Sequence, residues 1–214
     1  YISESIKCHH NEIVNYIESN YLQDQKTNFI EKALEFYNFA LIDDNLIGQS
    51  TFCDLCKYNY VELVKIFLES KKIDVNYIKV IWKNINEYRK LKLQKTALFF
   101  AIEKENVEII KLLLTNLDID VNIINKWEAG SGSSEEEKIY DGDDYTGEDK
   151  TALYLAVQKR NLEIVKLLLS NVNIDVNIMN KKIWYRNNEK QDTALFIAVE
   201  NEDIEIIKLL LMNK

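Results

Sequence analysis

One segment recurs along this chain with its internal spacing almost unchanged. Three copies read TALFFAIEKENVEIIKLLLTNLDIDVN from Thr96, TALYLAVQKRNLEIVKLLLSNVNIDVN from Thr151 and TALFIAVENEDIEIIKLLLMNK from Thr193. A fourth copy, STFCDLCKYNYVELVKIFLESKKIDVN, starts at Ser50 and has Leu55 in the place of the alanine. Self-similarity of this kind is typical of arrays of stacked units. The sequence therefore predicts four repeats, of unequal length, that begin at residues 50, 96, 151 and 193.

Each copy has the pattern of two short antiparallel helices. Thr96 is placed to cap the first helix, and the small Ala101 allows a neighbouring helix to approach closely. Asn106 precedes the second helix, and Glu108 follows in its first turn, where an acidic side chain suits the positive helix end. The aliphatic residues that follow Glu108 form an apolar face that is too wide for one neighbouring helix to cover. Because neither helix can bury this face alone, we expect the units to stack.

These segments resemble the ankyrin repeat family. The stretches TALFFA, TALYLA and TALFIA stand where that family has Thr-Pro-Leu-His-x-Ala. The stretches VEIIKLLL, LEIVKLLL and IEIIKLLL are similar to its second helix, and IDVN is similar to its closing Asp-Val-Asn. The resemblance covers residues 50–214, and it implies an all-α solenoid of stacked helix pairs with long hairpin-like finger loops.

The sequence departs from the family pattern at three places. The proline is alanine in all three Thr-Ala-Leu copies, and one residue is added before Asp-Val-Asn. The glycine that normally ends the first helix is replaced in every repeat, by Asn59, Glu105, Arg160 and Glu202. We therefore expect the turn between the two helices to differ from the usual one.

The repeat boundaries divide the chain into 1–49, 50–95, 96–150, 151–192 and 193–214. Within the first region, SIKCHHNEIVNYIESN and KALEFYNFALI follow the repeat pattern loosely. We interpret that region as degenerate helical repeats, with a separate helical cap as the alternative. The chain begins with a tyrosine and stops soon after IIKLLL, so we interpret it as a piece of a longer protein whose last repeat is partial.

The connections between repeats are long. We call them finger 1 (residues 77–95), finger 2 (123–150) and finger 3 (178–192). Insertions between repeats map to loops on one face, which is often the binding face. The helices then form a scaffold, and the fingers carry the features particular to this chain.

All three tryptophans of the chain lie in the fingers. Trp, Tyr and Arg dominate the energetics of many protein interfaces, so the aromatic and basic finger residues are the candidates for partner binding. They are Trp82, Tyr88, Arg89, Trp127, Trp184, Tyr185 and Arg186. The alternative is that each tryptophan packs its own finger against the next one.

Charge also distinguishes the fingers. Finger 1 carries +5, finger 2 carries −6 and finger 3 carries +2, in a chain of net charge −8. Neighbouring fingers could attract one another, or the pattern could steer a partner of mixed charge. Exposed ion pairs contribute less than about 1 kcal/mol each, so steering is the favoured interpretation.

Finger 2 contains the stretch AGSGSSEEEKIYDGDDYTGEDK. Gly and Ser followed by an acidic run are typical of a mobile loop, and we expect residues 131–144 to be mobile. An alternative interpretation of this stretch is that Tyr140 and Tyr145, which have acidic neighbours, are phosphoacceptor sites. The spacing of the acids does not match a calcium-binding loop, so calcium is rejected.

Catalytic and metal-binding patterns are weak. Cys53 and Cys56 have the spacing of half a zinc or redox site, which Cys8, His9 and His10 could complete. In the repeat pattern, however, both cysteines align with apolar residues of the first helix, where cysteine packs as a small hydrophobe. Two adjacent histidines provide no catalytic triad, and no Gly-rich phosphate loop is present. We therefore expect no catalytic residues, no metal and no cofactor.

Composition limits the remaining function classes. The chain has no proline and five glycines, which favours helices over a turn-rich β-sandwich. Three cysteines indicate a reducing compartment, most simply the cytoplasm, and no apolar run is long enough to span a membrane. The acidic balance argues against nucleic acid as a partner.

The resemblance and the fingers together predict a monomeric, non-catalytic scaffold that binds another protein. The alternatives are a metal or redox module at Cys53 and Cys56, and nucleic-acid binding through the basic finger 1.

Overall fold

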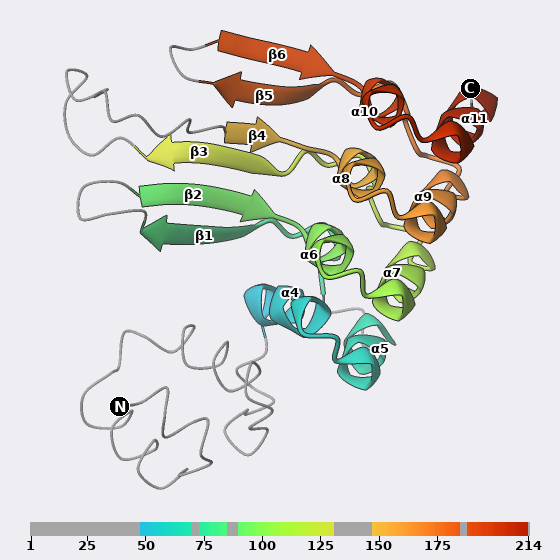
Figure 1. Cartoon of the computed structure of the whole chain (residues 1–214). Coiled ribbons are helices and arrows are strands. Elements are labelled where there is room, and N and C mark those ends of the chain that lie inside the picture. Colours follow the sequence, from blue (N-terminus) through green and yellow to red (C-terminus); the bar gives the residue numbers. More distant parts are fainter. Residues whose placement is uncertain (1–47, 70–72, 85–89, 131–146, 185–187, 214) are drawn as a thin grey trace, which may run out of the picture.

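The protein is an array of helix pairs from which strands project to one side (Figure 1). The computed structural model describes residues 48–69, 73–84, 90–130, 147–184 and 188–213. The first helices of the pairs are α4 (Gln49–Lys57), α6 (Ala97–Glu103), α8 (Ala152–Gln158) and α10 (Ala194–Glu200). The second helices are α5 (Val61–Glu69), α7 (Val107–Leu114), α9 (Leu162–Leu169) and α11 (Ile204–Met212). The degenerate repeats expected before residue 48 lie outside the described residues.

The helix starts follow from the repeated threonine. The side chains of Thr96, Thr151 and Thr193 each accept a hydrogen bond from the backbone N–H three residues further on, so the predicted cap is confirmed. Asn106 precedes α7 as expected, but its side chain does not cap that helix. Its amide instead donates to the carbonyl oxygen of Cys56 at 2.8 Å and so ties the second repeat to the first.

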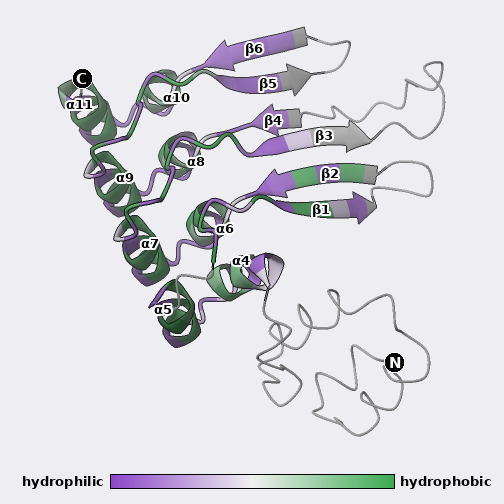
Figure 2. Cartoon of the chain, turned by 180° about the vertical axis from the view of Figure 1, so that it is seen from behind, coloured by the Kyte–Doolittle hydropathy of each residue, from purple (hydrophilic) through white to green (hydrophobic). Residues whose placement is uncertain are grey.

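The core runs without interruption through all four helix pairs. First helices stack on first helices and second helices on second helices, as Figures 1 and 2 show from opposite sides. Ala101, Ala156 and Ala198 are 0% exposed, which confirms the close helix contacts expected at these small residues. None of the helices in the described part of the chain has the length and apolar character needed to cross a bilayer.

The closing asparagine of the IDVN motif joins successive repeats at their other end. The side-chain amide of Asn76 donates to the carbonyl of Asp118 at 2.7 Å, and its oxygen accepts from the N–H of Asp120 at 2.8 Å. Asn122 makes the same two bonds to the carbonyl of residue 173 and the N–H of residue 175. One conserved geometry therefore links repeats 1 and 2 and repeats 2 and 3.

The fold is not all-α, because the fingers form two three-stranded antiparallel sheets. Sheet 1 contains β1 (Lys79–Asn84), β2 (Lys90–Lys95) and β3 (Lys126–Gly130). Sheet 2 contains β4 (Gly147–Asp149), β5 (Asn180–Trp184) and β6 (Asn188–Asp192). The expected all-α class is therefore correct only for the helical array. Long fingers leave many backbone groups unpaired, and sheet formation between fingers satisfies them.

The turns between paired helices also differ from the expectation. The positions where glycine is replaced, Asn59, Glu105, Arg160 and Glu202, all have φ between 55° and 65°. After α6, the N–H of Glu105 bonds to the carbonyl of Ile102 and the N–H of Asn106 to that of Ala101. This is a Schellman motif, which requires a left-handed residue whatever its side chain. The expected change of turn is therefore wrong, and each non-glycine residue there costs about 1–2 kcal/mol.

Replacing one of these residues by glycine should stabilise the protein. We expect Glu202→Gly to raise the free energy of unfolding by about 1 kcal/mol, because glycine adopts a positive φ without a Cβ clash. Lys208→Gly, on the exposed face of α11, is the matched control and should lower it by about 1 kcal/mol. Urea denaturation measures both values, and a loss of stability in both variants would contradict the prediction.

Candidate functional site

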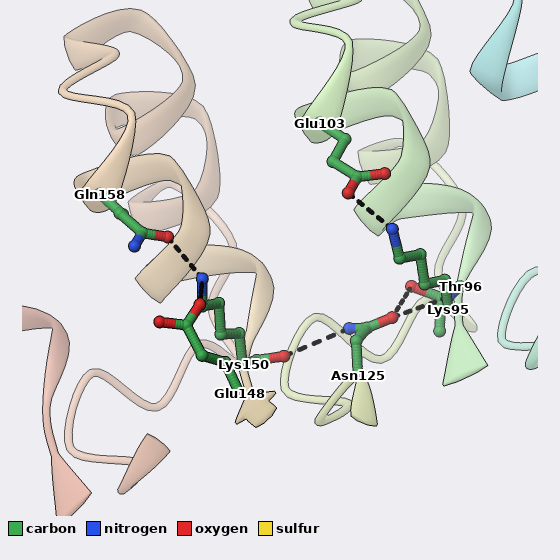
Figure 3. Close-up of polar contacts among 7 residues, drawn as sticks. All are labelled: Lys95, Thr96, Glu103, Asn125, Glu148, Lys150 and Gln158. Atoms are coloured by element: carbon green, nitrogen blue, oxygen red, sulfur yellow. Dashed lines mark hydrogen bonds and ion pairs between the residues drawn. The ribbon is translucent and has the colours of Figure 1, made fainter. Parts of the chain in front are cut away.

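Each finger is fastened at its base to a first helix by a lysine side chain. The Nζ of Lys95 donates to Glu103 at 2.6 Å, and that of Lys190 donates to Glu200 at 3.1 Å. The intervening Lys150 donates to Gln158 at 2.7 Å and forms an ion pair with Glu148 (Figure 3). These bonds fix the direction in which the strands leave the helices.

Lys150 differs from Lys95 in the partner that its helix provides. Both lysines are buried, but Gln158 is neutral where Glu103 carries a charge. Burial, together with the nearby ammonium group of Lys182, lowers the pKa of Lys150 to about 8. Part of the Lys150 population is therefore neutral at slightly alkaline pH.

Asparagine side chains provide a second fastening at the same place. The Oδ1 of Asn125 accepts from the N–H of Thr96 at 2.8 Å, and Asn180 does the same for Thr151 at 2.7 Å (Figure 3 shows the first). The backbones of Asn125 and Lys150 exchange two hydrogen bonds, of 2.8 and 2.9 Å. The starts of α6 and α8 are thus each held to the base of the following finger.

Finger 3 is also tied to α8, the first helix of the pair that precedes it. The hydroxyl of Tyr154 in α8 donates to Oδ1 of Asp192 at 2.7 Å, and both residues are buried. Burial and this hydrogen bond raise the pKa of Tyr154 well above its ordinary value, so the hydroxyl remains a donor. Lys190 Nζ lies 3.5 Å from the other carboxylate oxygen of Asp192.

Finger 2 is shared between its neighbours. Above its base, its first strand, β3, pairs with β2 of finger 1, and its last strand, β4, pairs with β5 of finger 3. The pairing sets acidic residues of finger 2 opposite basic residues: Glu128 faces Lys92, Glu148 faces Lys182, and Asp149 faces Lys181. Opposite charges at facing positions favour such pairing. The stretch expected to be mobile, with Tyr140 and Tyr145, lies outside the described residues.

Sheet 1 has one face turned toward the helices. Residues directly opposite each other on paired strands share a face, so Ile81, Leu93 and Trp127 lie together. Ile81 packs against the helical core, and Leu93 is buried. The Nζ of Lys95, on the same face, lies 5.6–5.7 Å from the ring centres of Phe99, Phe100 and Trp127. Trp127 therefore has a packing role beside α6.

The opposite face of sheet 1 is open to solvent, and we call it the outer face. It is formed by Val80 and Trp82 of β1, Lys92 and Gln94 of β2, and Lys126 of β3. Trp82 is 58% exposed, and Lys92 is its direct cross-strand neighbour. The two tryptophans of sheet 1 thus lie on opposite faces, which no sequence pattern could reveal without the strand pairing.

The other candidate residues are placed less completely. Trp184 ends β5 opposite Asn188, and its side chain lies outside the described part. The described ranges also exclude four candidates: Tyr88, Arg89, Tyr185 and Arg186. Sequence reasoning missed the outer-face neighbours Val80, Lys92 and Lys126. The only sequence signal for these residues was the alternation along a strand between side chains that face the helices and side chains that face away from them.

The two cysteines of α4 are packed inside the core. Cys53 and Cys56 are fully buried free thiols. Burial raises the pKa of Cys53 to about 12 and that of Cys56 well above its ordinary value. Since the thiolate is the nucleophile and the metal ligand, both side chains act as small apolar groups. The described residues contain no cluster of three or more metal-ligand side chains, and Cys8, His9 and His10 lie outside them.

The contrast between Glu103 and Gln158 can be tested by exchanging them. Glu103→Gln should lower the free energy of unfolding by about 1–3 kcal/mol, because buried Lys95 loses its charged partner. Gln158→Glu should stabilise the protein at neutral pH and raise the pKa of Lys150. Denaturant titrations of both variants at pH 7 measure these effects, and two changes of the same sign would contradict the prediction.

The lowered pKa of Lys150, beside the neutral Gln158, predicts that the stability of the protein depends on pH. Folded Lys150 loses its proton near pH 8, whereas in the unfolded chain it keeps the proton until near its ordinary pKa of 10.5. The unfolded state therefore binds more protons in this window, and the contribution of Lys150 to stability rises between pH 8 and pH 10.5. Gln158→Glu should reduce that rise. Equal pH profiles for the wild type and the variant would contradict the lowered pKa.

The buried thiols should be unreactive in the folded protein. In a Cys8→Ser background, we expect no reaction of Cys53 or Cys56 with an aromatic disulfide reagent until denaturant is added. Lys166→Cys, which places a thiol on the exposed side of α9, is the positive control. Rapid labelling of the native protein, or stoichiometric zinc by elemental analysis, would instead support the metal or redox alternative.

Comparison with known proteins agrees with this architecture. A family model described as ankyrin repeats, in three copies, matches residues 23–125 and 134–214. A search of the curated proteins gave no match. The matched residues make up most of the chain, and the structure has stacked helix pairs with fingers where the family pattern requires them. The chain therefore belongs to the ankyrin repeat family, whose repeats generally mediate protein–protein interactions.

Proposed function

We propose that this chain is a non-catalytic scaffold that binds another protein through its fingers and through the concave side between fingers and first helices. Membership of the ankyrin repeat family supports binding to a protein in general terms. Fold alone does not determine function, so the specific assignment rests on the fingers.

The observation that carries the proposal is an exposed tryptophan on a firmly held strand. Trp82 lies on β1, whose first residue, Lys79, is buried and paired with Asp54 of α4. A large aromatic side chain on a fixed backbone loses little conformational freedom when a partner covers it. Such residues are typical binding hot spots. We propose that the remaining candidate residues of fingers 1 and 3 belong to the same recognition region.

The buried polar groups near the fingers support a non-catalytic role. Lys95, Lys150 and Asp192 each take part in a contact that holds a finger to a helix. Buried free thiols fit a reducing compartment, so we place the protein in the cytoplasm. We also propose that it acts as a monomer.

Truncating Trp82 distinguishes binding from packing. The whole chain is immobilised, and retained proteins are identified by mass spectrometry and then titrated individually. Trp82→Ala should weaken partner binding about thirtyfold, or about 2 kcal/mol, with little change in melting temperature. Leu117→Ala, at an almost fully exposed loop position after α7, is the control and should leave the affinity unchanged. A lower melting temperature with unchanged affinity would show that Trp82 only packs its finger.

A further inference from the structure

Two aliphatic side chains at equivalent positions of neighbouring repeats are almost fully exposed. Leu117 and Val172 are each 96% exposed, more than any other large apolar residue that the structure describes. They lie in the segments that follow α7 and α9, which we call loop 2 (residues 115–122) and loop 3 (residues 170–177). The loops begin where the second helices end, and the second helices form the side of the array away from the strands (Figure 1). Binding through the fingers therefore does not account for this exposure.

The stacking of the two loops places these side chains in one row. The side chain of Asn122 in loop 2 binds the carbonyl of Asn173 and the N–H of Asp175 in loop 3. Leu117 stays exposed although loop 3 is stacked on its own loop, so it faces the side of the array and not the neighbouring repeat. Helices of adjacent repeats pack about 8–10 Å apart, and we expect a similar separation between the two aliphatic side chains.

The same two loops are negatively charged. Asp118, Asp120 and Asp175 are exposed, and none of them forms an ion pair with another described residue. Loops 2 and 3 contain no lysine or arginine, so the three aspartates give them a net charge of −3. The row of aliphatic side chains is therefore bordered by carboxylates alone.

The lysines closest to these loops do not remove this charge. The helices α7 and α9 contain one glutamate and one lysine each, so they add no net charge. Beyond the loops, Lys126 is exposed and reduces the sum to −2, whereas Lys181 is paired with Glu189. Three further lysines belong to the loops of the first and last repeats and lie outside the described residues: Lys71, Lys72 and Lys214. The surface considered is therefore limited to loops 2 and 3.

Val172 also borders a hollow in the surface. The hollow has a volume of about 340 Å³, and its wall includes the aliphatic side chains of Leu169, Ile174 and Val176. Asp175 lies in the same wall. Pockets that hold small molecules have volumes from about 300 Å³, so there is room for one large apolar side chain of a partner, with a carboxylate beside it for a cation.

The backbone of the loops favours a helical partner over an extended one. Most backbone N–H groups of both loops already donate within the protein, at residues 116, 118–120 and 122 and at their equivalents in loop 3. An extended segment would find few backbone partners here, whereas a helix bonds its own backbone. Seven residues of a helix rise about 10.5 Å, which is close to the separation expected between Leu117 and Val172.

We propose that loops 2 and 3 bind a short basic amphipathic helix of another protein, with apolar residues at i, i+4 and i+7 and with lysine or arginine beside them. The apolar residues would cover Leu117 and Val172, and one of them would enter the hollow. The basic residues would pair with the three aspartates, and this opposite charge would speed association and set the orientation of the helix. This surface is separate from the fingers, so it goes beyond the proposed function.

A defined probe tests the proposal on the full chain. The probe is a fluorescein-labelled peptide, Lys-Lys-Leu-Ala-Lys-Ala-Leu-Lys-Ala-Leu-Lys-Ala-Lys-Ala, titrated by fluorescence anisotropy. A second peptide of the same composition, with its leucines distributed around the helix, is the control for attraction by charge alone. We expect saturable binding of the first peptide that weakens with added salt, and about tenfold or greater weaker binding of the second.

Variants of the protein locate the site. The double variant Leu117→Ser/Val172→Ser should weaken binding of the first peptide about tenfold or more, and Asp118→Lys about fivefold or more. Glu205→Lys makes the same change in net charge at the opposite end of a second helix and should alter the affinity less than about twofold. Trp82→Ala should have no effect. Thermal melts followed by circular dichroism verify that each variant is folded.

Four results would overturn the proposal. They are no saturable binding, equal binding of the two peptides, equal weakening by Asp118→Lys and Glu205→Lys, and unchanged binding by Leu117→Ser/Val172→Ser. Weakening by Trp82→Ala in place of the loop variants would assign the peptide to the fingers and would equally overturn it. A protein partner that depends on Trp82 and not on Leu117 belongs to the fingers, so the scaffold function stands or fails independently of this surface.

Discussion

Contact between neighbouring first helices is the interaction on which the rest of the structure depends. These helices have seven to nine residues, too few to be stable alone in water. They persist because Ala101, Ala156 and Ala198 let adjacent helices approach until no solvent remains between them. The fingers leave from the N-terminal ends of these same helices. The spacing of the stack therefore determines which finger strands come close enough to pair.

The helical part of the fold could be predicted because its determinants are local and repeated. The cap at Thr96 and the small Ala101 recur at fixed spacing, so each copy confirms the interpretation of the others. The turns could not be predicted from residue preference. Glutamate disfavours a positive φ, but Glu105 adopts one because the hydrogen bonds of its own N–H and of the Asn106 N–H require that backbone conformation. Here tertiary structure overrides local propensity, at a cost in strain.

The sheets could not be predicted for a different reason. The sequence of finger 2 indicates a single insertion, yet β3 pairs with finger 1 and β4 with finger 3. Pairing between strands that belong to different repeats depends on the distance between helix pairs, which no local pattern encodes. The faces of Trp82 and Trp127 follow from that pairing and from nothing else in their neighbourhoods. Composition could therefore identify candidate residues but could not separate the packing tryptophan from the exposed one.

The two ends of each finger are under different physical demands. At the base, a change at Lys95 or Asn125 would leave a buried polar group without its partner, and the penalty would fall on folding. On the outer face, Trp82 and Lys126 are not among the core residues of the described part of the chain, so we expect substitution there to change the surface more than the scaffold. A fixed base with a tolerant outer face is what a binding surface requires. Under the proposed function, the outer-face residues would vary with the partner, while the helices keep those residues in place.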